Sequence, residues 1–484
     1  MASHFRPVFS IAGLLCILFS FSVVPAIFVS WYYQDGEIAD LFVSFILILF
    51  AGVFLWLLNH DRQINLRSRD GFLVVTVFWL MLGVLGALPF KLALNVSAVD
   101  ALFESVSGLT TTGATVFSNL DTMQPSILFY RQELQWFGGM GLIVLAVAVL
   151  PMLGIGGMSL YRAEIPGPMK DDKIMPRLYM GSRILWLIYV GLTAACALAY
   201  WLAGMSTFDA ISHSLTTVST GGFSTHDASL AYFESEYVDD IAVVFMLLGS
   251  INFGVHYTAL HTQNLNAYFK DKEVQAFVIF VVAAIAVVAV SLWWSNYSEH
   301  WVEILQTSIF EVVSIVTTTG YGIADFSIWP IFLPFFLILI SFVGGCGGST
   351  AGGVKVMRMD ILIRLGYREI LRLVHQKGIF PVKIGGKPVA SRTLQSILGF
   401  FSLYIASFVV LLLMLLVTTD VDQITAFSAI ATCINNTGPG LRDVALSFSS
   451  LNDSGKMISV AAMLLGRLEI FSILVLFHPE FWRS

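Results

Sequence analysis

The feature that most constrains this chain is a succession of strongly apolar segments, each about as long as a lipid bilayer is thick. A transmembrane helix needs about 20 consecutive, mostly apolar residues. Ten segments approach this length: residues 8–31, 41–58, 71–90, 134–153, 184–202, 241–257, 277–294, 328–343, 397–417 and 457–476. We interpret the first as a retained helix, because its apolar run is long and lacks a clear small-residue cleavage site. The sequence therefore predicts an all-α polytopic membrane protein.

The composition agrees with this class. Of 484 residues, 57% are hydrophobic and 12% are charged, whereas soluble proteins carry about 25% charged residues. The net charge of −6 gives no reason to expect a nucleic-acid partner. Only four cysteines occur, far apart in sequence, which argues against a disulfide framework or a zinc site and favours buried single thiols.

The positions of Lys and Arg orient the segments, because cytoplasmic loops carry an excess of positive charge. If Arg6 is cytoplasmic, the later connections on that side hold Arg62, Arg67, Arg69, Arg162, Lys170, Lys173, Arg177, Arg183, Lys270, Lys272 and the basic stretch from Lys355 to Arg392. The opposite connections, such as YYQDGE, NYSEH and TTDVD, are acidic or neutral. Both termini are therefore expected in the cytoplasm.

A half-length apolar segment followed by a polar turn with glycine recurs in four outward loops. The copies read DALFESVSGLTTTGATV from Asp100, DAISHSLTTVSTGGFS from Asp209, SIFEVVSIVTTTGYG from Ser308 and ITAFSAIATCINNTGPG from Ile424. Aligned on their Thr-Gly pairs, they superpose Thr112-Gly113, Thr220-Gly221, Thr319-Gly320 and Thr437-Gly438, about a hundred residues apart. The chain is predicted to divide into an N-terminal hairpin (residues 1–65) and four repeats, residues 66–160, 161–268, 269–385 and 386–484.

Each short segment has ~10 to 12 apolar residues, which is roughly 15 to 18 Å of helix and crosses only half of a bilayer. A single Thr-Gly turn would most simply cap an ordinary extracellular loop. Four equivalent turns instead favour four half-membrane helices around a pseudo-fourfold pore, because irregular backbone at membrane depth must be buried in protein or line a wet cavity. Glycine lets successive carbonyls point one way, and carbonyl rings replace the hydration shell of a cation. The arrangement predicts cation permeation.

The third turn is similar to the potassium-channel filter Thr-Val-Gly-Tyr-Gly, with Thr318-Thr319-Gly320-Tyr321-Gly322 in its place. Four units of outer helix, pore helix and inner helix (M1-P-M2) in one chain resemble the TrkH/KtrB/HKT superfamily of K+ transporters. The motifs QWFGGMG from Gln135 and GRLEIF from Gly466, with the extra N-terminal hairpin, resemble the TrkH and TrkG branch over almost the full length. The resulting expectation is a potassium-channel-like fold with ten transmembrane helices and four pore helices that takes up K+ across the bacterial inner membrane.

The residues expected to bind K+ lie in the four turns. They are Thr111, Thr112, Gly113, Ser219, Thr220, Gly221, Thr318, Thr319, Gly320, Asn436, Thr437 and Gly438. Only the third turn continues as Gly-Tyr-Gly, so we expect weaker selectivity for K+ over Na+ than in a homotetrameric channel, with K+ and Rb+ handled alike. A Na+-preferring or weakly selective cation transporter, and an H+- or Na+-coupled K+ symporter, stay open as alternatives.

The eighth apolar segment is interrupted by GGCGGSTAGG, residues 344–353, in which six of ten residues are glycine. Each glycine costs about 1 kcal/mol relative to alanine in a helix, so the helix should break. We expect a mobile gating loop beneath the filter, rather than a simple hinge or linker. The candidate gate residues are Gly344, Gly345, Gly347, Gly348, Ser349, Thr350, Gly352, Gly353 and Arg467.

Arg467 is predicted to lie mid-span, where a lone charge is costly and usually functional. We expect it to face the inner pore and oppose cation passage; the alternative is a structural ion pair with Glu469. Glu104 and Glu311 lie on pore helices, where they tune the field or form hydrogen bonds behind the filter. The remaining polar candidates are assigned packing, interfacial or anchoring roles: His213, His256, His261, Arg131 and Glu133.

An intramembrane enzyme is the competing class, but the chain has no H-E-x-x-H, no nucleophile motif with a partner base and no P-loop. We expect K+ as substrate and no organic cofactor. The basic stretch from Lys355 to Arg392 suits an acidic cytosolic subunit. The family resemblance implies that this subunit is a nucleotide-binding protein of the TrkA type, and that the chain forms a homodimer in membrane lipid.

Overall fold

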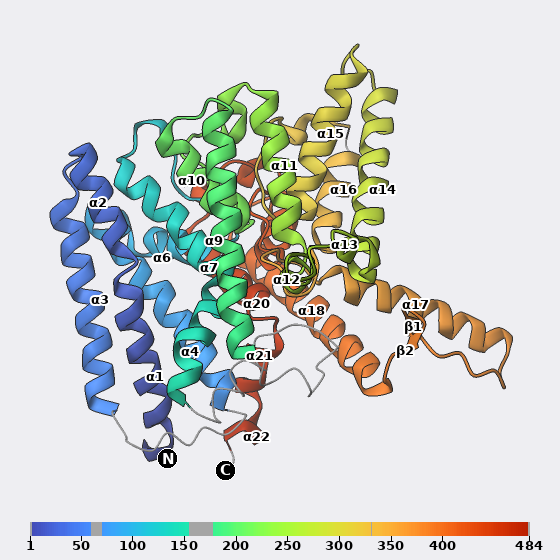
Figure 1. The fold of residues 1–484 in the computed structure, drawn as a ribbon, viewed down its shortest axis with the longest axis horizontal. Coiled ribbons are helices and arrows are strands. Elements are labelled where there is room, and N and C mark those ends of the chain that lie inside the picture. The colour runs from blue at the N-terminus through green and yellow to red at the C-terminus, as the bar shows by residue number, and fades with distance from the viewer. Residues whose placement is uncertain (1, 60–69, 154–177, 331, 483–484) are drawn as a thin grey trace.

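The computed structural model describes residues 2–59, 70–153, 178–330 and 332–482, and these residues are mainly helical (Figure 1). The helices are α1 (Ala2–Ser20), α2 (Val23–Tyr33), α3 (Ile38–Asn59), α4 (Asp70–Gly86), α5 (Leu88–Ala93), α6 (Ala98–Leu109), α7 (Pro125–Leu153), α9 (Leu178–Leu202), α10 (Thr207–Val218), α11 (Glu236–Ser250), α12 (Phe253–Thr262), α13 (Asn266–Lys270), α14 (Lys272–Trp294), α15 (Trp301–Val316), α16 (Phe332–Ser341), α17 (Val356–Val374), α18 (Ser391–Thr418), α19 (Gln423–Asn435), α20 (Asp453–Arg467), α21 (Phe471–Leu474) and α22 (Pro479–Trp482). Within the described ranges, the strands β1 (Lys383–Ile384) and β2 (Lys387–Pro388) form one antiparallel hairpin.

Six described spans are long and apolar enough to cross a membrane: Arg6–Tyr33, Ile38–Asn59, Asp70–Ala93, Arg183–Leu202, Lys272–Trp294 and Ser391–Thr418. Large apolar side chains on these helices, including Phe50 on α3 and Trp294 on α14, are exposed on the outside of the bundle. Exposed apolar surface of this kind is what a lipid environment stabilises. The protein is therefore a multi-pass membrane protein, as its hydropathy predicts.

Two of the predicted spans are broken in the structure. The segment predicted at 241–257 is divided between α11 and α12, which meet at 96°, because Asn252 caps α12 by accepting a hydrogen bond from the Gly254 N–H at 2.7 Å. The segment predicted at 457–476 is divided at 104° after α20, where Glu469 and Ile470 have φ of 53° and 54°. Arg467, predicted to lie mid-span, is the last residue of α20 and lies at this break.

Two other predicted spans differ in length. The segment predicted at 134–153 belongs to α7, which already begins at Pro125. Among its described residues, the segment predicted at 328–343 contains the ten-residue α16, which is too short to cross a bilayer by itself. The chain then leaves helical geometry for the glycine-rich segment before α17, a helix that projects sideways from the bundle (Figure 1).

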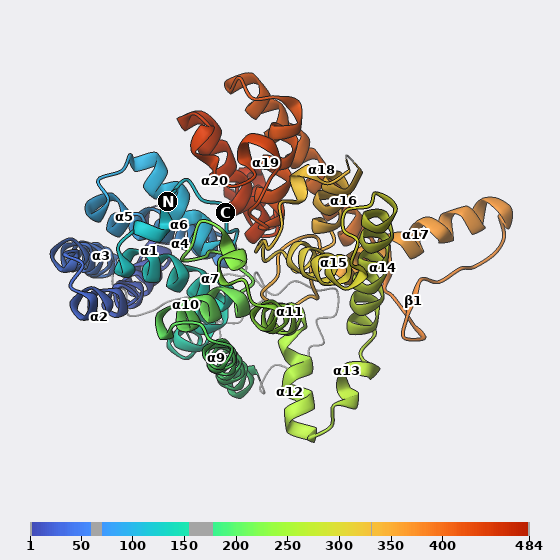
Figure 2. The same cartoon turned by 90° about the horizontal axis from the view of Figure 1, so that it is seen from above.

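Four short helices, α6, α10, α15 and α19, have 12, 12, 16 and 13 residues. Three begin with a side-chain cap: Ser97 and Ser206 accept from the backbone N–H three residues on, and Asp422 from the Ile424 N–H. Such caps satisfy free N–H groups of the first turn. Seen from above, the four helices lie in four separate groups around a common centre (Figure 2).

Two large apolar clusters support this arrangement. One packs α1, α4, α6, α18, α19 and α20 together, and the other packs α9, α11, α14, α15 and α16. All four cysteines are free and buried, as expected from their spacing. The start of α1 and helix α22 lie at the same end of the molecule, away from α10 and α15 (Figure 1). This places both ends of the described chain on one side of the bundle.

Candidate functional site

The four short helices end in turns with the same backbone conformation. In each turn one residue has a left-handed φ: Thr111 (54°), Thr220 (51°), Thr318 (56°) and Asn436 (56°). Two residues later a glycine has φ of 81°, 79°, 82° or 94°, at Gly113, Gly222, Gly320 and Gly438 respectively. Residues other than glycine rarely adopt a positive φ. The repeated pattern therefore identifies equivalent positions independently of the sequence alignment.

The hydrogen bonds of the turns give the same register. The residue between each positive-φ pair donates its N–H to the carbonyl five residues earlier: Thr112 to Ser107, Gly221 to Thr216, Thr319 to Ser314 and Thr437 to Thr432, at 2.8 to 2.9 Å. Gly221 is thus equivalent to Thr112, and the glycine of the second turn is Gly222. The predicted alignment on Thr220-Gly221 is wrong by one residue, and Ser219 lies one position before the equivalent triplet. The two adjacent glycines of STGGF made the sequence alignment ambiguous.

The four turns meet in a closed ring. An ideal Cβ built on Gly113 would lie 2.2 Å from the carbonyl oxygen of Gly221. Equivalent positions on Gly222, Gly320 and Gly438 would lie 1.9, 2.0 and 2.7 Å from the carbonyl oxygens of Thr319, Thr437 and Thr112. Each turn therefore contacts the next in the order one, two, three, four and back to one. We call the carbonyls of Thr112, Gly221, Thr319 and Thr437 the carbonyl ring.

A cavity of about 320 Å³ opens directly beside this ring. The four positive-φ glycines that follow the ring residues line this cavity: Gly113, Gly222, Gly320 and Gly438. The loops that follow the turns complete its wall and contribute the imidazole of His226. The ring thus has access to an open, partly polar space formed jointly by the four repeats.

The carboxylates of Glu104 and Glu311 form hydrogen bonds behind the turns. Glu104 accepts from the Val116 N–H at 3.1 Å and from the Thr115 hydroxyl at 2.9 Å. Glu311 accepts from the N–H groups of Ile323 and Ala324 at 2.9 and 3.1 Å. Both glutamates are buried. Their geometry therefore supports the second sequence interpretation, hydrogen bonding behind the turns.

In the second and fourth repeats other side chains bond the segment that follows the turn. His213 Nε2 lies 3.0 Å from the Ser224 hydroxyl, and the Ser428 hydroxyl accepts from the Leu441 N–H at 2.9 Å. His213 is fully buried, which agrees with the packing role predicted for it. In each repeat, at least one side chain of the short helix thus forms a hydrogen bond to the segment that follows the turn. Such bonds define the path of irregular backbone that lacks a regular secondary structure.

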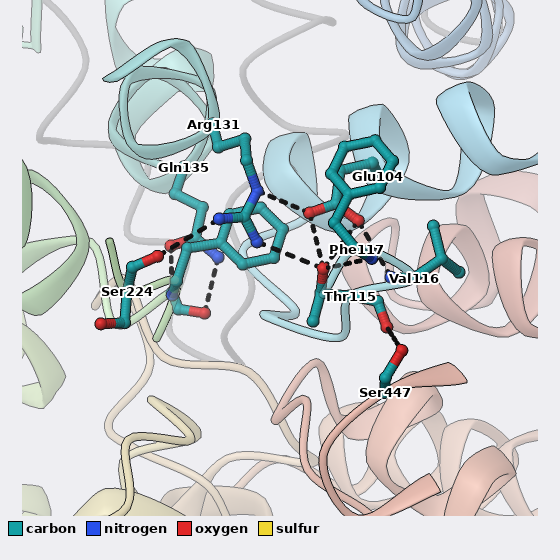
Figure 3. Close-up of polar contacts among 10 residues, drawn as sticks. Glu104, Thr115, Val116, Phe117, Arg131, Gln135, Ser224 and Ser447 are labelled. Atoms are coloured by element: carbon teal, nitrogen blue, oxygen red, sulfur yellow. Dashed lines mark hydrogen bonds and ion pairs between the residues drawn. The ribbon is translucent and has the colours of Figure 1, made fainter. Parts of the chain in front are cut away.

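Arg131 is buried within α7, so the prediction that it anchors the start of a span is wrong. Its Nε donates to Glu104 Oε1 at 2.7 Å, and its Nη1 donates to the Ser224 carbonyl at 3.2 Å (Figure 3). The guanidinium also lies over the ring of Phe223, 4.3 Å from its centroid. Arg131 therefore links the segment after the first turn to the segment after the second. Glu133, predicted with it as an anchor, is also buried in α7.

The glycine-rich segment, residues 344–353, passes under the turns and contacts three of them. The Thr350 hydroxyl lies 3.1 Å from the Val218 carbonyl and 3.2 Å from the Thr220 hydroxyl. The Gly352 N–H donates to the Thr318 hydroxyl at 2.6 Å, and the Gly353 N–H to the Asn435 carbonyl at 3.0 Å. The segment therefore lies next to the C-terminal ends of α10 and α19 and against the turn that follows α15. This is the position that the sequence predicts for a loop beneath the turns.

Close packing explains why glycine is needed in this segment. A Cβ on Gly352 would lie 2.1 Å from the Asn435 carbonyl oxygen, and one on Gly344 would lie 2.2 Å from the Gly352 carbonyl oxygen. Gly344, Gly348 and Gly353 also have positive φ, at 70°, 74° and 75°. A side chain at these positions would either collide with a neighbouring carbonyl oxygen or require a positive φ, which residues other than glycine rarely adopt.

Arg467 reaches the same segment from the end of α20. Its Nη1 donates to the Thr350 carbonyl at 3.1 Å and its Nη2 to the Gly138 carbonyl at 2.6 Å. Glu469, which the sequence offers as an ion-pair partner for Arg467, pairs with Arg358 at 2.7 Å. Arg467 therefore joins the glycine-rich segment to α7 and α20.

Sequence reasoning missed three residues of this site. The adjacent Gly221 makes Gly222 ambiguous in the sequence, and the position of Arg131 before an apolar segment predicts only an anchoring role. Gln135 belongs to the QWFGGMG motif, which gives it no role of its own, yet its amide donates to the Gly221 carbonyl of the second turn at 2.6 Å. A polar run, Arg131 to Gln135, inside an otherwise apolar helix was the available signal, because buried polar groups must find partners.

Comparison with known proteins gives a consistent result. The model of the TrkH family, described as cation transport protein, matches residues 38–484. The chain is 48% identical to the Trk system potassium uptake protein TrkH of Vibrio parahaemolyticus, over 99% of this chain and 100% of that protein. It is 46% identical to the TrkH protein of Escherichia coli K12, with the same coverage, and 41% identical to the TrkG protein of that strain, over 100% of this chain and 99% of that protein.

The fold comparison agrees with the sequence comparison. The structure superposes on the crystal structure of the potassium transporter TrkH from Vibrio parahaemolyticus with a TM-score of 0.90 and 45% identity, covering 99% of both chains. The chain therefore belongs to the TrkH family, a family of transporters and not of enzymes.

Proposed function

We propose that this protein takes up K+, and handles Rb+ alike, through a pore whose filter is the carbonyl ring. The observation that carries the proposal is the closed ring of four turns, in which each glycine contacts the carbonyl of the next turn. Rings of backbone carbonyls replace the hydration shell of an alkali cation. The related TrkH proteins are named potassium uptake proteins, and the solved relative is a potassium transporter.

The electrostatics of the ring favour a cation over an anion. Each of the four short helices directs its C-terminal end toward its turn, and this end carries a partial negative charge. The ring residues themselves are neutral, so the ion would be bound by carbonyl oxygens and threonine hydroxyls and not by a carboxylate. We assign the filter to Thr111 to Gly113, Thr220 to Gly222, Thr318 to Gly320 and Asn436 to Gly438.

Selectivity should be weaker than in a homotetrameric channel. In the corrected register the turns continue as Gly113-Ala114, Gly222-Phe223, Gly320-Tyr321 and Gly438-Pro439. Only Tyr321 resembles the potassium-channel filter, and its hydroxyl lies 3.3 Å from the Thr217 hydroxyl of the second repeat. Because a different residue follows the glycine in each turn, the four sides of the pore differ beyond the ring. Fewer symmetric ion-binding sites can therefore form there.

The glycine-rich segment and Arg467 form the proposed gate. The segment contacts the turns through hydrogen bonds, including those of Thr350 and Gly352, and through close backbone contacts, and six of its ten residues are glycines without a side chain to pack. Segments with few buried apolar contacts open at low free-energy cost. The guanidinium of Arg467 donates to the Thr350 carbonyl and so places a positive charge at the glycine-rich segment. Movement of the segment would open the pore toward α20.

The wider assembly is proposed on the family relationship and on charge. We place both termini in the cytoplasm of a bacterial cell and the protein in its inner membrane. The four pore repeats span residues 66–160, 161–268, 269–385 and 386–484 and follow the N-terminal hairpin of residues 1–65, with ten transmembrane helices in all. Each chain has its own ring, so a homodimer would contain two pores.

The cytosolic face offers a docking surface for a TrkA-type nucleotide-binding subunit. Helix α17 and the β1–β2 hairpin project from the bundle there (Figure 1). Part of their basic charge is already paired within α17, by Arg364 with Asp360 and by Arg368 with Glu369. Lys377, Lys383 and Lys387 add further positive charge after α17.

The function is tested by flux into liposomes that contain the purified protein alone. We expect rapid 86Rb+ uptake that K+ competes and Na+ barely affects. Equal 22Na+ uptake would refute K+ selectivity and support a weakly selective cation transporter. Dependence of Rb+ uptake on an imposed H+ or Na+ gradient, at constant membrane potential, would establish the coupled symporter in place of channel-like permeation.

A further inference from the structure

The second repeat lacks a side chain that the other three repeats place at the carbonyl ring. Thr112, Thr319 and Thr437 occupy the ring position in repeats one, three and four, whereas repeat two has Gly221. The Thr112 hydroxyl bonds the Thr110 hydroxyl at 2.7 Å, and the Thr319 hydroxyl bonds the Thr317 hydroxyl at 2.8 Å. Gly221 can make no equivalent bond.

The side chain of Gln135 fills the space that a threonine at 221 would occupy. An ideal Cβ on Gly221 would lie 2.4 Å from Gln135 Cδ, 2.4 Å from its Oε1 and 2.9 Å from its Nε2. Real side-chain carbons do not approach so closely. Gln135 comes from α7, the inner helix of repeat one, and extends with Arg131 toward the second turn (Figure 3). A neighbouring repeat thus supplies the group that repeat two lacks.

The amide of Gln135 is bonded to the filter backbone at both ends. Its Nε2 donates to the Gly221 carbonyl at 2.6 Å, and its Oε1 accepts from the Phe223 N–H at 3.0 Å. The side chain is fully buried. Among the described residues, Gly221 is the one ring member whose carbonyl accepts a side-chain hydrogen bond.

The backbone at residue 221 does not itself require glycine. Its φ lies outside the left-handed range, in contrast to that of Gly222, which is 79°. An L side chain would therefore be allowed by backbone geometry, and Ser219 would offer the hydroxyl that Thr110 and Thr317 offer in repeats one and three. The three heavy atoms nearest to an ideal Cβ at this position all belong to Gln135, so this side chain excludes a threonine here.

We propose that Gln135 is a positioning residue of the ion filter, which replaces the missing threonine of repeat two and holds the Gly221 carbonyl in the ring. This assignment rests on the proposed filter function. Because the amide N–H polarises one of four ring carbonyls, Gln135 also makes the ring electrostatically asymmetric. The size of the ring and its preference between Rb+ and Na+ then depend on a residue outside the four turns.

The test is a set of four proteins in the liposome assay: the unchanged protein, Gln135→Ala, Gly221→Thr, and the variant that carries both substitutions. Gln135→Ala removes the donor of the Gly221 carbonyl, and Gly221→Thr collides with Gln135. Each is expected to lower the ratio of 86Rb+ to 22Na+ uptake by about tenfold, which corresponds to about 1.4 kcal/mol. The double variant makes room for the threonine and restores the pattern of repeats one and three, so its ratio should return to within about threefold of the unchanged protein.

Gln132→Ala is the matched control. Gln132 lies on the same helix and is equally buried, but its amide atoms have no hydrogen-bond partner among the described residues. Its replacement should leave the uptake ratio unchanged. Thermal unfolding of every variant separates loss of the fold from loss of selectivity.

Gln135→Glu covers the case in which the alanine variant does not fold. It keeps the shape of the side chain and the acceptor for the Phe223 N–H, and in its ionised form, which a cation in the filter favours, the carboxylate cannot donate to the Gly221 carbonyl. We expect a folded protein with a lowered uptake ratio. An unchanged ratio in Gln135→Glu or Gln135→Ala, or a double variant no better than the poorer single variant, would overturn the assignment. An unchanged protein that takes up Na+ and Rb+ equally would instead refute the proposed filter itself.

Discussion

The buried ion pair between Arg131 and Glu104 should stabilise the protein strongly against removal of either partner alone. The perturbation is Arg131→Met, which keeps much of the side-chain length and removes the charge. The two side chains are 1% and 0% exposed, and their N–O distance is 2.7 Å. Without Arg131, the Glu104 carboxylate keeps only the Val116 N–H and the Thr115 hydroxyl. Breaking a buried pair from one side costs about 3–5 kcal/mol.

The reverse substitution, Glu104→Gln, should cost less than Arg131→Met. Arg131 would keep the Ser224 carbonyl and the face of Phe223, and the new amide oxygen could still accept from the Val116 N–H. Replacing both charges together is often close to neutral, because neither is then left buried without a partner. The double variant should therefore be more stable than Arg131→Met alone by about 2 kcal/mol or more.

The assay is equilibrium unfolding in mixed micelles, followed by tryptophan fluorescence, for the unchanged protein, both single variants and the double variant. Arg364→Met on α17 is the control, since Arg364 is half exposed and pairs with Asp360 at the surface. An exposed pair of this kind contributes about 0.3–0.5 kcal/mol. A loss below about 1 kcal/mol in Arg131→Met, or additive effects in the double variant, would refute the reasoning from burial.

Three further predictions concern the gate, the ring and the outer loops. Arg467→Ala removes the charge on the glycine-rich segment and should raise 86Rb+ uptake several-fold; unchanged uptake would contradict a barrier role. Gly320→Ala places a Cβ 2.0 Å from a ring carbonyl at a φ of 82°, so uptake should be abolished in protein that still elutes as a folded species. Burial lowers the pKa of His226, but the carboxylates of Asp209 and Asp121, 3.4 and 2.6 Å from its ring nitrogens, outweigh this and raise the pKa above 6.5. The charged imidazole therefore stabilises the loop fully below pH 6.5 and loses this effect as the pH rises through the raised pKa, so His226→Gln should lower the unfolding temperature near pH ~5.5 and much less near pH ~8.5. Equal losses at both pH values would contradict the assignment of charge to His226.

The four glycine-bearing turns and the membrane class were predictable because both depend on local sequence. Apolar runs of bilayer length are visible without any knowledge of packing, and Thr112-Gly113 and Thr319-Gly320 lie in segments that match without a gap. The high density of glycine at residues 344–353 likewise predicts a break in the helix, because the unfavourable helix propensity of glycine does not depend on tertiary contacts. The breaks after α11 and α20 were not predicted, because apolar composition alone does not distinguish a straight span from a bent one.

The sequence by itself determined that this chain enters a membrane and that it carries four glycine-bearing turns, each after a short apolar helix. Only the tertiary structure decided the register of the second turn, the partner of Arg131 and the place of Gln135. These depend on contacts between residues far apart in the chain: Gln135 and Gly221 are separated by 86 positions. Such contacts arise from the packing of one repeat against the next, and no local pattern of residues encodes which buried polar group will meet which carbonyl.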